Sequence, residues 1–328
     1  MYRLADQFSH PPTKTESFTM IIAGIVTFEP DINRLRENLE AISSQVPHLL
    51  IYDNGSSNSK EIENLAAAAK NVTVLRSPSN DGVAAALNRL AEAALNLEAK
   101  ALLTLDQDSV CSPDLVFKLS NELKEGIGMV TPYVVDRNKQ TLEEYRCIEL
   151  PPTETYRQPA RKGAITSGAI VDLAAWSRIG GFDEIFFIDY VDYDFNQRLM
   201  DAGYAILRVN AAPLLHEVGR AKRTWLRVPR KDLSGAWRIE PFFAFGHGPS
   251  RCYYKARNRV LFTRKHGRKL GITHEGVWQI PQQIVLTLLF ERERFAKLQA
   301  FVRGIRDGMR VPILGRKDEE TMSEGTLY

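Results

Sequence analysis

The chain has 328 residues, of which 44% are hydrophobic and 25% are charged. This composition is ordinary for a globular protein, and the length allows a nucleotide-binding core with a smaller appended region. A formal net charge of +3 is too small to indicate nucleic-acid binding, although Arg and Lys become frequent after residue 220. The three cysteines are widely spaced and form no metal-binding pair, which predicts free thiols in a reducing cytoplasm.

The N-terminal 19 residues mix prolines, threonines and charges without an apolar core, so we expect a loose tail and no secretory signal. No segment reaches the roughly 18 to 20 apolar residues that span a bilayer. Residues 277–290 come nearest, but Pro281, Gln282 and Gln283 interrupt them. We therefore expect a cytoplasmic protein, dissolved or lying on the inner face of the plasma membrane.

Short apolar runs alternate with helical patterns from residue 20 onward. Strands are predicted at 20–28, 48–53, 72–76 and 101–105, with helices that begin at Asp31, near Ile62 and after a cap at Asp81. Residues 133–162 are polar and read as an irregular insertion. The pattern then predicts a strand at 164–171, a helix ending at Gly180, a helix in the second half of 186–201 and a strand at 205–209. Beyond Trp237 we expect only helices, at 248–266, 276–290 and 292–306.

Strands that alternate with helices predict an α/β fold, with a parallel sheet covered on both faces. Ligands of such sheets bind at the C-terminal ends of the strands. Thr27, Asp53 and Asp106 all stand at predicted strand ends. We expect three parts: a tail at 1–19, a nucleotide-binding domain at 20–236 and a helical region at 237–328.

Asp106-Gln107-Asp108 follows one of these apolar strands. Two carboxylates one residue apart can meet a divalent cation and a nucleotide ribose together, and Mg²⁺ often takes only one or two protein carboxylates. We assign Asp108 to the metal, with Asp106 and Gln107 on the nucleotide side. Acids after strands are common in ordinary loops, so the motif gains meaning only from its companions.

Two further segments follow strands and offer polar groups. Asp53, before Asn54 and Gly55, could accept a hydrogen bond from the N3–H of uracil or thymine, or could form a simple Asx turn. The turn at Gly82 opens a helix whose N–H groups could approach the nucleotide, or that is merely capped there.

Taken in order, these segments resemble inverting glycosyltransferase family 2, whose members have the GT-A fold. The resemblance extends over residues 21–219 and rests on segments at 27–30, 53–56, 80–84, 106–108, 166–169 and 180–198. It implies that Thr27, Phe28, Asp53, Asn54 and Gly82 contact the nucleotide sugar. It also implies an acceptor side formed by Ser167, Gly168, Asp189 and Tyr190.

Aligning the last segment on Arg198 places Asp192 at the position of the family's catalytic base. The family often has Glu-Asp there, whereas this chain has Val191-Asp192. Asp189 is a competing candidate, and a plain solvated helix edge is the structural alternative. The aromatic residues interleaved with these acids argue against an exposed edge.

A histidine and an arginine complete the predicted site. His216 is a candidate ligand of Mg²⁺ or Mn²⁺ and equally a candidate for a structural role. Arg257 could bind a phosphate bidentately, or could belong to a basic helix face.

The resemblance implies transfer of a sugar to a saccharide or polyprenol-linked acceptor in cell-surface polysaccharide synthesis. The segment 187–192, together with the Asp-Gln-Asp form at 106–108, resembles the rhamnosyltransferase branch. This resemblance implies dTDP-L-rhamnose as donor, and a UDP-sugar is the alternative. The C-terminal helices are expected to contact an anionic membrane, or to pack in the core or in a homo-oligomer. A nucleotidyltransferase is a weaker alternative, because no glycine-rich phosphate loop follows the first strand. A carbohydrate-binding module without enzymatic activity is the second alternative function.

Overall fold

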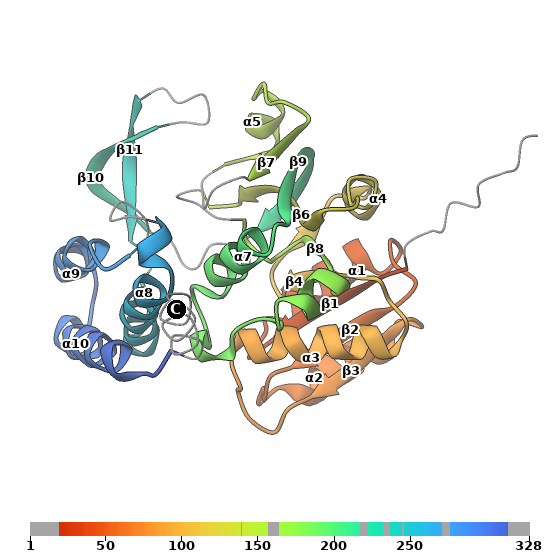
Figure 1. The fold of residues 1–328 in the computed structure, drawn as a ribbon, viewed down its shortest axis with the longest axis horizontal. Helices are drawn as coiled ribbons and strands as arrows, with labels where there is room; N and C mark the ends of the chain where they lie inside the picture. Colours follow the sequence, from red (N-terminus) through yellow and green to blue (C-terminus); the bar gives the residue numbers. More distant parts are fainter. Residues whose placement is uncertain are drawn as a thin grey trace, which may run out of the picture.

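A nine-stranded mixed sheet forms the centre of the protein, in the strand order β3-β2-β1-β4-β8-β6-β9-β5, with β7 paired to β9 (Figure 1). The structure is a computed structural model, and it describes residues 20–138, 140–156, 164–216, 222–231, 237–244, 246–270 and 276–313. The predicted N-terminal tail lies outside these residues. The α/β fold class, with a mixed sheet, flanking helices and C-terminal helices, is confirmed.

The first half of the sheet is parallel, as predicted. Its strands are β1 (Ile21–Thr27), β2 (Leu49–Asp53), β3 (Val72–Arg76) and β4 (Ala101–Asp106). The connecting helices are α1 (Ile32–Ile42), α2 (Ser59–Ala67) and α3 (Val83–Asn96). Asp31 caps α1 by accepting from the N–H groups of Asn33 and Arg34. The cap predicted at Asp81 is wrong, because α3 begins after Gly82 and the Asp81 carboxylate accepts from the hydroxyls of Ser77 and Ser79.

The second half of the sheet mixes strand directions. It contains β5 (Val110–Cys111), β6 (Ile127–Asp136), β7 (Thr153–Tyr156), β8 (Ala169–Asp172) and β9 (Ala205–His216). Its helices are α4 (Leu115–Ser120), α5 (Leu142–Arg146), α6 (Leu173–Arg178), the 3-10 turn η1 (Glu184–Phe186) and α7 (Val191–Asp201). Strand β8 runs antiparallel to both β4 and β6.

Three secondary-structure predictions are corrected here. The segment read as an irregular insertion contains the end of β6, α5 and β7, which pairs with β9. The strand predicted at 205–209 continues to His216 through a register shift opposite Pro132 and Tyr133. The expectation of helices only beyond Trp237 is wrong, because β11 (Trp237–Ala244) pairs with β10 (Lys222–Lys231) in an antiparallel hairpin. The predicted boundary at 236/237 falls inside this hairpin.

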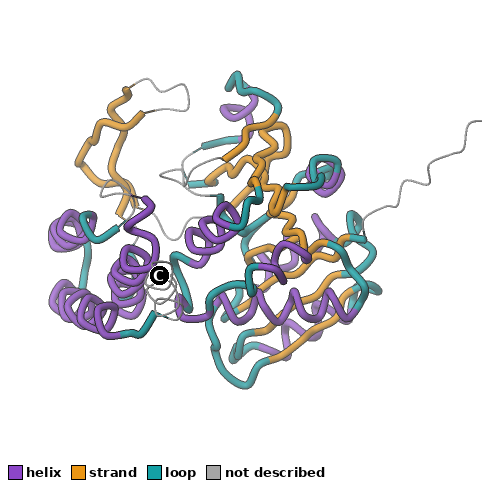
Figure 2. Tube along the Cα trace, in the orientation of Figure 1, coloured by secondary structure: helices purple, strands orange, loops and turns teal. Residues whose placement is uncertain are grey.

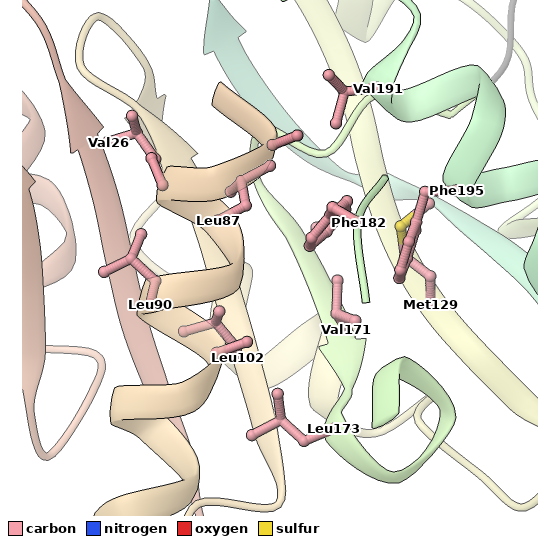
Figure 3. Close-up of a cluster of buried hydrophobic side chains, with 14 of the residues drawn as sticks. Val26, Leu87, Leu90, Leu102, Met129, Val171, Leu173, Phe182, Val191 and Phe195 are labelled. Carbon is pink, nitrogen blue, oxygen red and sulfur yellow. The ribbon is translucent and has the colours of Figure 1, made fainter. Parts of the chain in front are cut away.

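Two apolar layers cover the faces of the sheet. Because successive strand residues point to opposite faces, Ile22 and Val26 of β1 pack with α3, α6 and α7, whereas Ile21, Ala23 and Ile25 pack with α1, α2 and α4. Figure 3 shows part of the first layer, in which Leu90 of α3 lies near Val26 and Leu102, and Phe195 of α7 lies near Met129.

Three C-terminal helices stand beside this core: α8 (Pro249–Leu270), α9 (Gln279–Phe290) and α10 (Arg294–Arg310) (Figure 2). Helix α10 packs closely on α8, where Gly304 and Gly308 of α10 meet the backbone of α8. Leu261 and Phe262 of α8 join the core layer that contains α7. The C-terminal helices are therefore tied to the sheet domain through α7. None of the helices in the described part of the chain has the length and apolar character that a membrane crossing requires.

Candidate active site

The ends of β1, β2 and β4 bring three predicted residues to one edge of the sheet. Thr27 is paired in register with Asp53, and Val26 with Asp106. Thr27 itself is fully buried, and its hydroxyl donates to the Tyr52 carbonyl at 3.3 Å. Phe28 is exposed, and its N–H donates to the Gln107 side chain at 2.8 Å. Gln107 thus ties the β1 loop to the Asp106-Gln107-Asp108 segment.

Asp53 lies in a buried position with one unused oxygen. Its side chain is 1% exposed, and Oδ1 accepts the Ser56 N–H at 3.0 Å. Oδ2 is buried without a hydrogen-bond partner and lies 3.8 Å from Nε of Arg76. A buried carboxylate oxygen without a donor is costly unless a ligand supplies one. The geometry therefore fits a carboxylate that accepts a hydrogen bond from a ligand.

The neighbouring Asn54 and Gly82 belong to a turn that supports this edge. Asn54 donates to the Asn80 side chain and to the Gly82 carbonyl, and accepts the Asp81 N–H. Gly82 has φ +91°, and a Cβ there would lie 2.6 Å from the Phe187 ring. The N–H of Val83, next along the helix, donates to the Phe187 carbonyl at 2.6 Å. The start of α3 is therefore covered by Phe187.

The acidic segment meets His216 at the end of β9. Strand β5 pairs Val110 with Leu215, which brings the loop after β4 beside the last residue of β9. His216 Nδ1 lies 3.5 Å from Oδ1 of Asp108, and its Nε2 lies 3.9 Å from Oδ2 of Asp106. Each of these three residues offers one ligand atom, and the three atoms all lie within 4.8 Å of one another. Carboxylates and an imidazole are a donor set that divalent cations accept, so the three residues fit a metal ion.

Hydroxyl and amide side chains hold this segment in place. Ser109 Oγ lies 3.0 Å from Nδ1 of His216 and 2.7 Å from Oγ of Ser167. Ser167 also accepts the Asp106 N–H at 3.0 Å, and Asn38 donates to the Asp106 carbonyl at 2.7 Å. Ser167 is 2% exposed. Ser167 therefore contacts the acidic segment, and its acceptor-side role stays a prediction.

Asp192 lies in the first turn of α7 and is partly buried. Thr166 Oγ1 donates to Oδ1 of Asp192 at 2.8 Å. Burial raises the pKa of Asp192 to about 6, with the charges of Asp106 and Asp189 adding to the rise and the Thr166 hydroxyl opposing it. Residues 166 and 167 are consecutive, so the β8 loop holds the Asp192 carboxylate with one residue and the Asp106 backbone with the next.

The other predicted acceptor residues have structural contacts. Gly168 is buried, with φ +77°, and its N–H donates to the Thr104 carbonyl at 2.7 Å. Tyr190 is 7% exposed and packs against Tyr193 and Phe262. Asp189 accepts two hydrogen bonds from Arg251, at 3.1 and 3.2 Å, so both of its oxygens are engaged.

Arg257 lies on α8, where its guanidinium stacks over the Tyr254 ring at 5.3 Å. Tyr254 in turn stacks on Phe187, with ring centroids 4.7 Å apart. The Arg257 Nε is buried without a hydrogen-bond partner. Its phosphate-binding role stays a prediction.

Sequence reasoning did not assign Thr166, Ser109, Asn38 or Asn258, which support the candidate site by hydrogen bonds. Thr166 and Ser167 stand together in a segment that carried the family resemblance, so a closer reading of that segment could have found Thr166. Ser109 follows Asp108 directly, but its partner His216 is 107 residues away.

Part of the chain matches a known protein family. Residues 24–179 match the model of glycosyl transferase family 2. This match supports the family resemblance of the sequence over that part of the chain. The match ends before Asp192 and His216.

Among individual proteins, the chain is similar to the dTDP-rhamnosyl transferase RfbF of Shigella flexneri. The two are 23% identical over 300 residues, which cover 88% of this chain and 95% of that protein. The chain also aligns with the crystal structure of GalNAc-T7 with UDP, GalNAc and Mn²⁺, at a TM-score of 0.49 and 15% identity. That alignment covers 62% of this chain and 44% of the other, so the chain spans less than half of that structure.

Proposed function

We propose that the chain transfers a sugar from a nucleotide-sugar donor to an acceptor hydroxyl, with inversion at the anomeric carbon and with Asp192 as the base. The observation that carries this proposal is the pair Thr166-Ser167, which joins Asp192 to the acidic segment at Asp106. A base and a candidate nucleotide–metal site, held together by one short loop, are what a single displacement needs.

The environment of Asp192 suits a base. A pKa of about 6 leaves the carboxylate ionised near pH 7 and makes it more basic than an ordinary aspartate. The carboxylate takes the proton of the acceptor hydroxyl while the hydroxyl oxygen attacks the anomeric carbon. The bond between that carbon and the diphosphate oxygen breaks, and the nucleoside diphosphate leaves. One displacement inverts the configuration.

The residues that would hold a divalent metal ion are Asp108, His216 and Asp106. Mg²⁺ and Mn²⁺ both accept these donors. Such an ion supplies positive charge that stabilises the leaving diphosphate. Ser109 contacts the His216 ring directly, and Ser167 contacts Ser109 and the Asp106 N–H.

For the donor we propose dTDP-L-rhamnose. The unpartnered Oδ2 of Asp53 is suited to the N3–H of thymine, and the similar protein from Shigella flexneri is named as a dTDP-rhamnosyl transferase. Uracil carries the same N3–H, so Asp53 alone does not distinguish dTDP from UDP. Phe28, Asn54, Gly82, Gln107 and Arg257 are proposed to line the rest of the donor site.

Binding measurements test the donor directly. Isothermal titration of the protein with dTDP-L-rhamnose, UDP-glucose and UDP-galactose, each with Mg²⁺ or Mn²⁺, should give the tightest binding for dTDP-L-rhamnose. Tighter binding of a UDP-sugar would indicate that the donor is a UDP-sugar. Release of dTDP in the presence of a saccharide acceptor would exclude a non-enzymatic carbohydrate-binding module.

We further propose that the acceptor is lipid-linked and that the protein docks on an anionic membrane beside it. The hairpin and α9 adjoin, since Trp225 lies 5.4 Å from Phe290. Exposed apolar side chains gather on these elements and at the start of α10: Trp225, Trp237, Ile239, Trp278, Leu289 and Phe295. Exposed arginines accompany them at positions 223, 227, 292 and 294. Aromatic and basic side chains together complement the interface of an anionic bilayer.

Vesicle co-sedimentation tests this docking surface. The protein should sediment with vesicles that contain anionic phosphatidylglycerol and stay in solution with neutral phosphatidylcholine. Arg227→Glu should weaken sedimentation, and Arg36→Glu on the distant α1 should not. Absence of sedimentation removes the membrane proposal. A dimer by light scattering that Trp237→Ala disrupts would instead assign this surface to a second copy of the chain.

A further inference from the structure

The segment immediately before Asp192 has an unusual backbone. Phe187, Asp189 and Tyr190 all have positive φ, at 55°, 59° and 69°. They are half of the six non-glycine residues with positive φ in the described part of the chain. A non-glycine residue in such a sparsely populated backbone region costs on the order of 1–3 kcal/mol. Strain of this kind persists only where the surroundings impose it.

A single buried side chain of α8 contacts this segment at three points. Asn258 is 0% exposed, and the two hydrogens of its Nδ2 are shared among the carbonyls of Phe186, Ile188 and Asp189, whose oxygens lie 2.5, 2.7 and 3.0 Å from Nδ2. The Phe186 carbonyl also accepts the N–H of Ile188 at 2.5 Å. The amide of Asn258 therefore stabilises the strained conformation over a competing extended one.

Two arginines of α8 add contacts to the same segment. Arg251 engages both oxygens of Asp189, and Arg259 Nε donates to the Tyr190 hydroxyl at 2.7 Å. Residues 251 and 258 are seven apart, so they lie on one face of the helix. On this face Phe262 continues the contact with Tyr190, at a ring-centroid distance of 5.5 Å.

Farther along α8, charged groups reach the first turn of α7. Lys265 Nζ and His266 Nε2 lie 2.7 and 2.8 Å from Oδ1 of the buried Asp194. Helix α8 therefore contacts residues 186–190 on one side of Asp192 and residue 194 on the other. Asp192 lies between these two points of contact, and its place in space depends on both.

We propose that Asn258 is a positioning residue for sugar transfer, which sets the start of α7 and hence the placement of the Asp192 carboxylate beside Asp106. This inference rests on the proposed function, because it takes Asp192 to be the base. It assigns part of the active-site machinery to a helix that lies beyond the matched family 2 domain, which ends at residue 179. The C-terminal region is then required for turnover.

The test compares Asn258→Ala with a matched control. Asn71 also donates its side-chain amide to two loop carbonyls, those of Ser43 and Val46, far along the chain from Asp192. Asn258→Ala should lower kcat about 10- to 100-fold, because small misplacements of a reacting group have costs of this size. The Kd for dTDP with Mn²⁺ should change less than about threefold, on the order of half a kcal/mol. Asn71→Ala should retain wild-type kcat.

Two further readouts separate positioning from a general structural effect. The acidic limb of the pH–rate profile should move in Asn258→Ala, since the surroundings of the Asp192 carboxylate change. Amide hydrogen exchange of a peptide spanning 186–195 should become faster in Asn258→Ala and remain unchanged in Asn71→Ala. The exchange experiment needs no turnover, so it remains informative if the proposed transfer itself is not found.

Specific outcomes overturn the proposal. A folded Asn258→Ala protein with wild-type kcat, pH profile and exchange contradicts it. An equal fall of kcat in Asn71→Ala would also contradict it. If Asn258→Ala does not fold, Arg251→Gln decides, because Arg251 is 43% exposed and its loss should leave folding intact. Wild-type kcat and exchange in Arg251→Gln would then overturn the inference.

Discussion

The Thr166 hydroxyl donates a hydrogen bond of 2.8 Å to the carboxylate of Asp192. This bond joins the loop that precedes β8 to the first turn of α7. It stabilises the ionised carboxylate and opposes the burial that raises its pKa to about 6.

Replacement of Thr166 by Val should therefore raise the pKa of Asp192 further. The base must be ionised to act, so the rate of the wild type should rise about tenfold per pH unit below about 6 and level off above it. In Thr166→Val the midpoint should move to higher pH, and kcat at pH 6 should fall. The pH dependence of kcat measures both effects. Thr73→Val, which alters a hydroxyl near His48 at the sheet's other end, is the control, and an unmoved midpoint in Thr166→Val would contradict the account.

Metal affinity should depend on His216 and on the serine behind it. His216→Ala and Asp108→Asn remove candidate ligands, and each should weaken Mn²⁺ binding at least about tenfold, as measured by electron paramagnetic resonance. Ser109→Ala should have a smaller effect in the same direction, because Ser109 only orients His216. Asp114→Asn changes a surface carboxylate paired with Lys118 and should leave Mn²⁺ binding unchanged. Wild-type Mn²⁺ affinity in His216→Ala would remove His216 from the site.

The nucleobase should be recognised through Asp53. Asp53→Asn should weaken dTDP binding by about 1.5–3 kcal/mol, the range for a hydrogen bond to a charged group. The binding of CDP, whose base has no N3–H, should weaken little in Asp53→Asn. Glu63→Gln removes the other carboxylate near Arg76 and serves as the control. Equal losses for dTDP and CDP, measured by calorimetry, would assign Asp53 to folding and not to the base.

Asp194 is predicted to contribute to stability through α8. Its burial alone would raise the pKa, but the hydrogen bond from His266 and the charges of Arg198 and Lys265 outweigh burial and lower the pKa to about 2. The stabilisation is therefore present above the unfolded value near 4 and is lost as the pH falls toward 2.

Asp194→Ala should lower the free energy of unfolding by about 3–5 kcal/mol, because it leaves buried cationic partners without their carboxylate. Urea denaturation at pH 7 measures this loss. Asp201→Ala, at an exposed pair with Lys269, should cost under about 1 kcal/mol. A similar small loss in both variants would show that the Asp194 network is not stabilising.

The sequence predicted the parallel half of the sheet well, because its strands and helices have clear periods. The ends of β1, β2 and β4 carry Thr27, Asp53 and Asp106, and their side-by-side placement follows from parallel pairing. The hairpin of β10 and β11 was missed because prolines 229 and 241 and closely spaced arginines hide the alternation of a strand.

The support of the candidate base was outside the reach of sequence reasoning. The contact of Asn258 with Phe186 joins residues 72 positions apart. No glycine or asparagine in the sequence signals the positive φ angles of Phe187, Asp189 and Tyr190, and of the three only Asp189 is a residue type that adopts positive φ readily. Only tertiary packing imposes these conformations.

The central claim is that Asp192 acts as the base for sugar transfer. The most direct measurement compares Asp192→Asn with the wild type, following both the release of dTDP from dTDP-L-rhamnose in the presence of acceptor and the Kd for dTDP with Mn²⁺. We predict that transfer falls by at least about 10²–10³-fold while dTDP binding changes little, because the amide keeps the shape but not the basicity. Wild-type turnover in Asp192→Asn would contradict the account.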